Sequence, residues 1–185
     1  MTDPKRKLQI AVIGTAGLEE YPRGNSPKES VYKTAERVGF LLAKKGVTVV
    51  TGGKGGVMES AARGARRAGG LTAGIVSGAK RLVSNRFMDV EFLTGSESPG
   101  LDELFVVLAS DGIISLGGGA GTLEEMSVAY RNKKPVVAIN GTGGWSERLS
   151  GEYLDERKTM KIETAKDAEE AVGKIILLIR NKNIK

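Results

Sequence analysis

Short apolar runs that stop at or near a glycine, each followed by a segment with helical spacing, recur along the whole chain. Such runs occupy residues 8–13, 47–51, 71–76, 113–116 and 135–139. Continuous apolar runs of this length are typical of strands buried on both faces, and strands that alternate with helices form parallel sheets. The sequence therefore predicts an α/β fold with a doubly wound, mainly parallel sheet and helices on both faces.

Helices are expected where apolar residues recur three or four positions apart. This spacing covers residues 26–45, 57–68, 101–108, 122–131 and 166–181. Two further segments look extended: residues 88–93 predict an irregular strand that crosses the top of the sheet, and residues 159–162 predict a short last strand. The length of 185 residues suits one domain with a substantial core, so we expect residues 1–185 to form a single domain.

The chain contains neither cysteine nor histidine. Disulfides, thiolate metal sites and thiol nucleophiles are therefore excluded, and the usual general base and transition-metal ligand are missing. Acid or base chemistry has to rest on carboxylates, lysine, tyrosine or a bound ligand. We predict no metal site, and the sequence by itself requires no cofactor.

The charge and the aromatic content bear on which partners the chain can bind. Lys and Arg number 28 against 22 Asp and Glu, a net charge of +6 that suits an anionic small molecule. The charge is dispersed, however, and aromatic residues make up only 5%, which leaves little surface for stacking bases, so we expect no nucleic-acid partner. The apolar runs are far shorter than the ~20 residues that span a membrane, and we expect a cytoplasmic protein with no membrane partner.

The most informative single stretch is the turn after the run 113–116, where Gly117-Gly118-Gly119-Ala120-Gly121 leads directly into a helical segment that begins at Thr122. Glycines let the backbone approach a ligand closely, and the free N–H groups at a helix start attract an anion, most often a phosphate. An ordinary tight turn is the alternative. Three consecutive glycines favour a phosphate site made by Gly118, Gly119, Ala120, Gly121 and Thr122.

Three further glycine-rich turns follow predicted strands. The turn after 47–51 contains Gly52, Gly53, Lys54, Gly55 and Gly56, and is interpreted either as a second phosphate-binding turn or as a close packing point between helix and sheet. The turn at Gly14 and Thr15 lacks the third glycine of the dinucleotide fingerprint and is weaker evidence. The turn at 140–145 contains Thr142 and Trp145, and Trp145 is either a wall of a cleft or the first apolar anchor of the next helix.

Carboxyl ends of parallel strands lie on one rim of a sheet, so these turns are expected to converge on one ligand cleft near the reversal in strand order. Arg81 and Arg86, in the irregular segment between the third run and 88–93, are further candidate cleft residues.

Residues 117–125 resemble the Pro-Gly-Gly-x-Gly-Thr-x-x-Glu motif of the LONELY GUY family, Rossmann-like proteins long misnamed lysine decarboxylases. Active members of that family release a base from a nucleoside 5′-monophosphate. The turn at 52–58 matches the partner motif of the same family. Gly117 in place of proline, together with residues 141–145, makes the chain more similar to the branch that contains the molybdenum cofactor carrier proteins. The resemblance implies a Rossmann-like fold and a homodimer or larger homo-oligomer.

One departure from the motif set bears on catalysis. In the hydrolases an arginine on the helix before the motif strand works with the last glutamate of the motif, here Glu125. The matching region of this chain reads Leu101-Asp102-Glu103-Leu104 and has no arginine. Arg81, Arg86 or Lys54 would have to replace it from another loop. Glu125 is therefore interpreted either as a catalytic group or as a carboxylate that stabilises the helix N-terminus.

Three functions remain open from the sequence. The first is a binding or carrier protein for a small phosphorylated, nucleotide-like ligand: a nucleoside monophosphate, phosphate or a molybdopterin-type cofactor. The second is a nucleoside 5′-monophosphate phosphoribohydrolase that uses Glu125. The third is a structural oligomer whose site has decayed.

Overall fold

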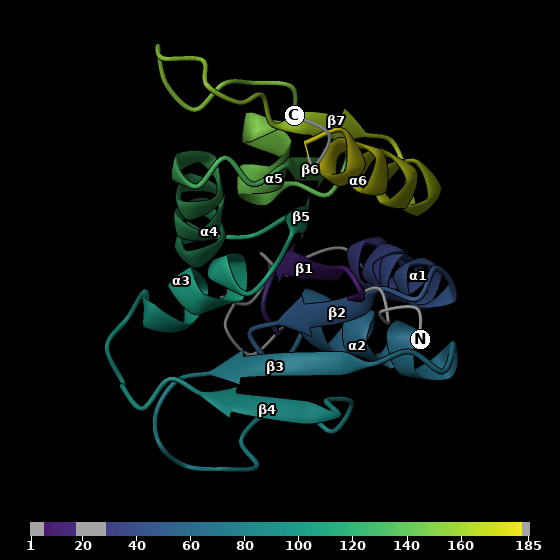
Figure 1. Cartoon of the computed structure of the whole chain (residues 1–185), viewed down its shortest axis with the longest axis vertical. Coiled ribbons are helices and arrows are strands. Elements are labelled where there is room, and N and C mark those ends of the chain that lie inside the picture. Colours follow the sequence, from purple (N-terminus) through teal and green to yellow (C-terminus); the bar gives the residue numbers. More distant parts are fainter. Residues whose placement is uncertain (1–5, 18–28, 183–185) are drawn as a thin grey trace.

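The computed structural model describes residues 6–17 and 29–182, and these form an α/β fold with helices on both faces of one sheet (Figure 1). The strands of the described residues pair in the order β4-β3-β2-β1-β5-β6-β7, and every pair is parallel. The predicted doubly wound parallel fold is therefore confirmed. The first residues of the expected helix 26–45, residues 26–28, lie outside the described part.

The strands are β1 Gln9–Gly14, β2 Thr48–Thr51, β3 Thr72–Val76, β4 Val90–Leu93, β5 Gly112–Leu116, β6 Val136–Ile139 and β7 Glu163–Ala165. The helices are α1 Glu29–Lys44, α2 Val57–Arg67, α3 Leu101–Leu108, α4 Ala120–Arg131, α5 Gly144–Leu149 and α6 Ala168–Lys182.

The strand order reverses between β1 and β5. From β1 the chain builds outward through β2 and β3 to β4, and α3 then returns it to β5, which pairs with the other side of β1. At the carboxyl end of this central pair Ile13 is opposite Ser115 and Gly14 is opposite Leu116. The turns that leave β1 and β5 therefore start beside each other, at the place where open α/β sheets bind ligands.

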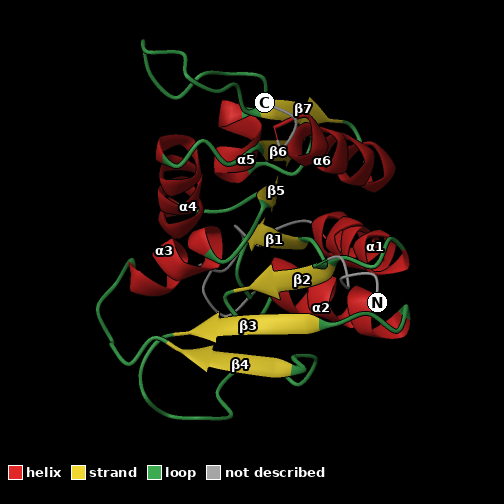
Figure 2. Cartoon of the chain, viewed as in Figure 1, coloured by secondary structure: helices red, strands yellow, loops and turns green. Residues whose placement is uncertain are grey.

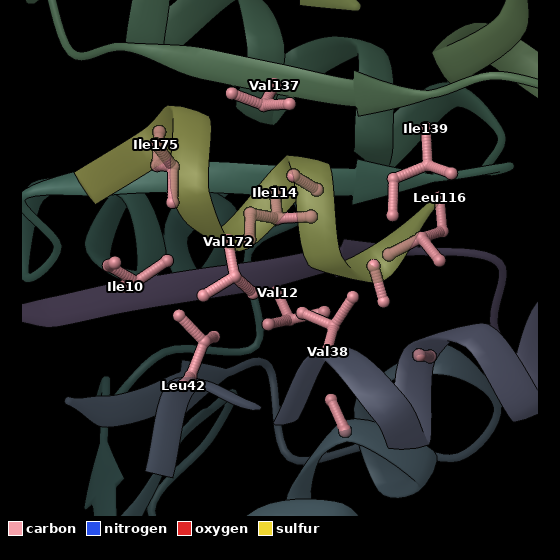
Figure 3. Packing of buried hydrophobic residues seen from close by; sticks show 14 of the residues in the cluster. Ile10, Val12, Val38, Leu42, Ile114, Leu116, Val137, Ile139, Val172 and Ile175 are labelled. Carbon is pink, nitrogen blue, oxygen red and sulfur yellow. The ribbon is translucent and has the colours of Figure 1, made fainter. Parts of the chain in front are cut away.

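Two hydrophobic layers hold the helices against the sheet. Alternate side chains of β1 point to opposite faces: Ile10 and Val12 pack with α1, α2 and α6, whereas Ala11 and Ile13 pack with α3 and α4. Figure 3 shows the first layer, in which Val38 and Leu42 of α1 and Val172 and Ile175 of α6 pack against one face of the strands. Because both faces are covered, the central strands read as continuous apolar runs in the sequence.

Residues 88–93 were expected to cross the top of the sheet, and this expectation is wrong. Residues Val90–Leu93 instead form β4, a parallel edge strand in register with β3 and the outermost arrow in Figure 2. The physical reason is a carboxylate: Glu91 accepts hydrogen bonds from the backbone N–H groups of Leu82 (2.6 Å), Val83 (3.0 Å) and Ser84 (2.8 Å). These bonds tie the preceding loop to the strand.

The last strand lies slightly later than its predicted position at 159–162. The backbone N–H of Ile162 donates to the carbonyl of Glu152 (2.9 Å), so this residue is held by the preceding loop while its side chain fills the core. Pairing with β6 begins at Glu163, opposite Val137.

Candidate functional site

A cavity of about 370 Å³ lies at the carboxyl ends of β1, β2 and β5, at the reversal in strand order. Its lining combines backbone from three strand exits with side chains from α2, α3 and α4: Gly14, Ala16, Gly52, Lys54, Met58, Asp102, Glu103, Val106, Gly119, Ala120, Gly121, Thr122 and Glu125. Eight of the residues predicted as site residues are in this set: Gly14, Gly52, Lys54, Gly119, Ala120, Gly121, Thr122 and Glu125.

The turn between β5 and α4 is held by side chains from distant segments. The backbone N–H of Gly117 donates to Thr142 Oγ1 and that of Gly118 donates to Thr15 Oγ1, both at 2.9 Å. Gly119 is the N-cap of α4 and has no side chain that could cap the helix with a hydrogen bond. The N–H groups at the start of α4 are therefore the ones that this turn presents to the cavity, while the N–H of Gly118 binds Thr15.

Two glycines of this turn have different roles. Gly118 has φ +91°, and a β-carbon on it would collide with the side chain of Thr122, so it lets the turn pack against the first turn of α4. A β-carbon on Gly119 would meet no heavy atom within 4 Å. Gly119 therefore leaves its backbone open to the cavity, as a ligand-binding amide requires.

The glycine-rich exit of β6 supports the β5 turn from outside the cavity. Trp145 and Ser146, at the start of α5, donate their backbone N–H groups to the carbonyls of Gly118 and Gly117, both at 3.0 Å. Trp145 lies under the guanidinium of Arg148, 5.0 Å from its ring centre, and is not a wall of the cavity. Thr142 lines a separate cavity of about 320 Å³ next to the starts of α1 and α6.

The β2 exit contributes Gly52 and Lys54 to the cavity, whereas its other glycines serve packing. Gly53 has φ +69°, and a β-carbon on it would lie 2.7 Å from Val76 Cγ1. Gly55 and Gly56 line a different hollow beside α1 and α2. At the β1 exit, a β-carbon on Gly14 would collide with the carbonyl of Leu116, so this glycine allows β1 and β5 to meet.

Three carboxyl groups and one ammonium group face the cavity. Asp102 and Glu103 come from the first turn of α3, Glu125 comes from α4, and Lys54 Nζ lies 3.2 Å from Asp102 Oδ2. Lys54 is the only cationic side chain among the described residues that line the cavity.

The acids ionise differently because their surroundings differ. Burial opposes ionisation of Asp102, but its hydrogen bond with Glu103 and the nearby Lys54 ammonium hold its pKa below its usual range. Burial, followed by the hydrogen bond to Asp102, raises the pKa of Glu103. Glu125 is 8% exposed, and burial, followed by the charges of Glu103 and Asp102, raises its pKa well above its ordinary value.

The two arginines proposed as cleft residues lie elsewhere. Arg81 and Arg86 are exposed on the segment between β3 and β4, and neither lines the cavity. Arg86 stacks over Phe87, with the guanidinium 5.0 Å from the ring centre. No described residue therefore supplies the guanidinium that the hydrolase motif pairs with Glu125.

Sequence reasoning missed Ala16, Met58 and Val106 as lining residues and treated Asp102 and Glu103 only as a departure from a motif. The available signal was a pair of acids on the first turn of the helix that precedes the motif strand. No group of three or more potential metal ligands gathers among the described residues. In the same part of the chain, no helix has the length and apolar character needed to cross a membrane.

Comparisons with known proteins identify relatives of this chain. A family model described as the SLOG cluster4 family matches residues 7–172. An uncharacterized protein from Archaeoglobus fulgidus is 37% identical over 132 residues, which is 71% of this chain and 80% of that protein.

Solved structures match nearly the whole chain. The structure of TM1055 has a TM-score of 0.82 at 35% identity and covers 92% of this chain and 99% of its own. A molybdenum cofactor binding protein from Rippkaea orientalis has a TM-score of 0.79 at 30% identity, and a molybdenum cofactor carrier protein from Chlamydomonas reinhardtii 0.76 at 27%; each covers 95% of this chain and 99% of its own. These matches confirm the predicted resemblance to the branch with carrier proteins.

Proposed function

Because the chain belongs to the SLOG cluster4 family, whose model matches residues 7–172, we propose that it binds and carries a phosphorylated, nucleotide-like ligand in the cavity between β1 and β5. The ligand is a nucleoside monophosphate or a molybdopterin-type cofactor. Its phosphate lies against the N-terminus of α4.

The observation that carries this proposal is the orientation of the α4 start. Gly119, Ala120, Gly121 and Thr122 all line the cavity, and nothing within 4 Å occupies the side-chain position of Gly119. N–H groups at a helix N-terminus have no intrahelical acceptor, and the helix dipole favours negative charge at the same place.

The relatives support the proposed ligand class. Two of the matched structures are described as a molybdenum cofactor binding protein and a molybdenum cofactor carrier protein. Their descriptions support the proposal that the cavity of this chain binds a cofactor of the same kind.

The acidic side of the cavity sets a condition for this function. A phosphate close to three ionised carboxylates would be repelled, but the raised pKa values of Glu103 and Glu125 favour their neutral forms. Lys54 offsets the charge of Asp102 across 3.2 Å. The cavity therefore accepts an anion at its α4 end at lower cost than its count of acids suggests.

Calorimetric titration with inorganic phosphate and a panel of nucleoside monophosphates tests the proposal, with Gly119→Val as the key variant. We expect Gly119→Val to remain folded and to lose about tenfold or more in affinity, because its side chain fills the approach to the amides. Gly173→Val is the matched control, since a β-carbon there also meets open space but lies on α6, away from the cavity. Unchanged affinity in Gly119→Val refutes the placement of the phosphate.

A second candidate function is nucleoside 5′-monophosphate phosphoribohydrolysis, and the position of Glu125 in the cavity favours it. A buried carboxyl with a raised pKa is a typical general acid. Chromatography after incubation with nucleoside monophosphates distinguishes the two functions. Free base that disappears in Glu125→Ala supports hydrolysis, whereas binding without base release supports a carrier.

We also propose a homodimer or larger homo-oligomer that binds no nucleic acid and is located in the cytoplasm. Size-exclusion chromatography with light scattering tests the assembly.

A further inference from the structure

Two carboxyl groups in the cavity have acceptor oxygens to which no described residue donates a hydrogen bond. Glu125 is 8% exposed, lines the cavity, and forms no hydrogen bond or ion pair with any residue that the structure describes. Glu103 Oε2 is buried and likewise has no partner among the described residues. An unsatisfied buried polar atom is costly, so Glu103 Oε2 points to a ligand that supplies the missing donor, and the Glu125 carboxyl lies in the same cavity.

The carboxyl groups that carry these acceptors lie close to the amides of α4. Glu103 Oε1 is 3.3 Å from the place that a β-carbon on Gly121 would take. Glu125 is five residues after Ala120, or about 7.5 Å along the helix axis, and helical side chains lean toward the N-terminus. One cavity therefore presents N–H donors and, a few ångströms away, carboxyl acceptors.

No described residue donates a hydrogen bond to Glu125 or to Glu103 Oε2. Lys54, the cation of the lining, pairs with Asp102. Burial and the neighbouring acids raise the pKa of Glu125, which is the result expected for a carboxyl group without donors. N–H groups of a ligand can bind the oxygens of a neutral carboxyl group without adding charge beside the phosphate.

We propose that Glu103 and Glu125 bind the N–H edge of an amino-substituted heterocycle, a 2-aminopyrimidinone ring of the kind found in guanine and in pterins. The inference rests on the proposed function, because the same ligand places its phosphate at the start of α4. Carboxyl oxygens accept N–H bonds from such an edge, and a neutral carboxyl group can also donate its O–H to an adjacent ring nitrogen.

A flat ring fits this end of the cavity better than a sugar diol does. Met58 and Val106 supply apolar side chains that can contact the faces of a ring. Hydroxyl groups would bring acceptor lone pairs of their own into a wall that already has too few donors.

The test compares guanosine 5′-monophosphate with inosine 5′-monophosphate, which lacks only the 2-amino group, by calorimetric titration at one pH. The wild-type protein is expected to bind the guanosine nucleotide about tenfold more tightly. Glu125→Gln and Glu103→Gln are expected to bring the two affinities together, because an amide –NH₂ opposes the ligand's donors. Glu124→Gln, an exposed acid next to Glu125, is expected to keep the tenfold preference.

Equal affinities in the wild-type protein, or a preference that survives both glutamine substitutions, overturn the inference. A tenfold loss with 2′-deoxyguanosine 5′-monophosphate that is abolished in Glu125→Gln would assign the carboxyl to the sugar and overturn it as well. If both nucleotides bind equally and Gly119→Val abolishes that binding, the carrier function stands and only this inference fails. Absence of binding by either nucleotide and by inorganic phosphate refutes both.

Discussion

The exits of β5 and β6 look alike in sequence and behave differently in the fold. Each is a glycine-rich turn between a buried strand and a helix, at 117–121 and 141–144. The β5 exit lies at the reversal in strand order and lines the cavity. The β6 exit is one strand further out and packs against the first turn, with its helix start bonded to the carbonyls of Gly117 and Gly118.

The difference shows that a glycine can be required for two opposite reasons. A β-carbon on Gly144 would collide with the carbonyl of Gly118, so this glycine permits close packing of one turn on the other. A β-carbon on Gly119 would enter open space, so this glycine leaves room for a ligand. Glycine density alone therefore does not identify a ligand-binding turn.

The largest effect is expected for Gly144→Ala. The residue has φ +60° and its new methyl group would meet backbone rather than a movable side chain, so we expect a loss of about 3 kcal/mol in the free energy of unfolding. Denaturant titration measures this loss.

Gly141→Ala, in the same turn, is the matched control for Gly144→Ala. It has φ +74° but open space around its side-chain position, so only the backbone strain of about 1 kcal/mol is expected. Equal losses in the free energy of unfolding of the two variants would contradict the packing role of Gly144 and the contrast between the two turns.

The next effect concerns the hydrogen bonds that hold the β5 turn. Thr15 is 3% exposed and its Oγ1 accepts the N–H of Gly118, so Thr15→Val leaves a buried donor without a partner. We expect the free energy of unfolding to fall by about 1–2 kcal/mol. Thr15→Ser keeps the hydroxyl oxygen and is expected to recover most of the loss. A thermal or denaturant melt of both variants decides whether the bond or the methyl group matters.

A pH series sharpens the contrast on the acidic side of the cavity. The folded-state pKa of Glu125 is raised, so its contribution to stability is fully present below the ordinary value of 4.5 and is lost as pH rises through the folded-state pKa. Glu125→Gln carries no charge at any pH, so its stability relative to the wild-type protein is expected to increase over that window. A constant difference between wild type and Glu125→Gln from pH 4 to pH 8 would contradict the raised pKa.

The smallest effect is expected outside both turns, for the double variant Arg81→Ala and Arg86→Ala. Neither side chain lines the cavity, and Arg86 stacks on half-buried Phe87, so ligand affinity should change by less than about twofold and stability by less than about 1 kcal/mol. A larger drop in affinity would mean that the segment between β3 and β4 reaches the ligand.

Most of the fold could be predicted from the sequence because the central strands are buried on both faces and therefore stand out as apolar runs. The edge strand β4 was harder to predict, because its apolar residues Val90 and Phe92 are 39% and 56% exposed and it has no continuous buried apolar run. Hydrogen bonds that Glu91 accepts from the loop at 82–84 hold this strand in place. No local sequence pattern predicts these bonds.

The candidate site was predictable in location but not in composition. Strand exits rich in glycine at the reversal in strand order were enough to indicate Gly119 and its neighbours. The acids of α3 join the site because that helix packs on α4 and brings Glu103 beside Gly121. Packing between two helices is a tertiary property, and the spacing of residues along the chain does not contain it.

The sequence by itself determined the parallel sheet, its helical layers and the rim on which the glycine-rich turns lie, because hydrophobic periodicity and glycine placement act locally. Only the tertiary structure decided which amides of those turns stay open to the cavity. Thr15 accepts a hydrogen bond from the N–H of Gly118, 103 residues away, and Thr142 accepts one from the N–H of Gly117, 25 residues away. A backbone N–H group is available to a ligand only when the fold has not already placed a hydrogen-bond acceptor from elsewhere in the chain next to it.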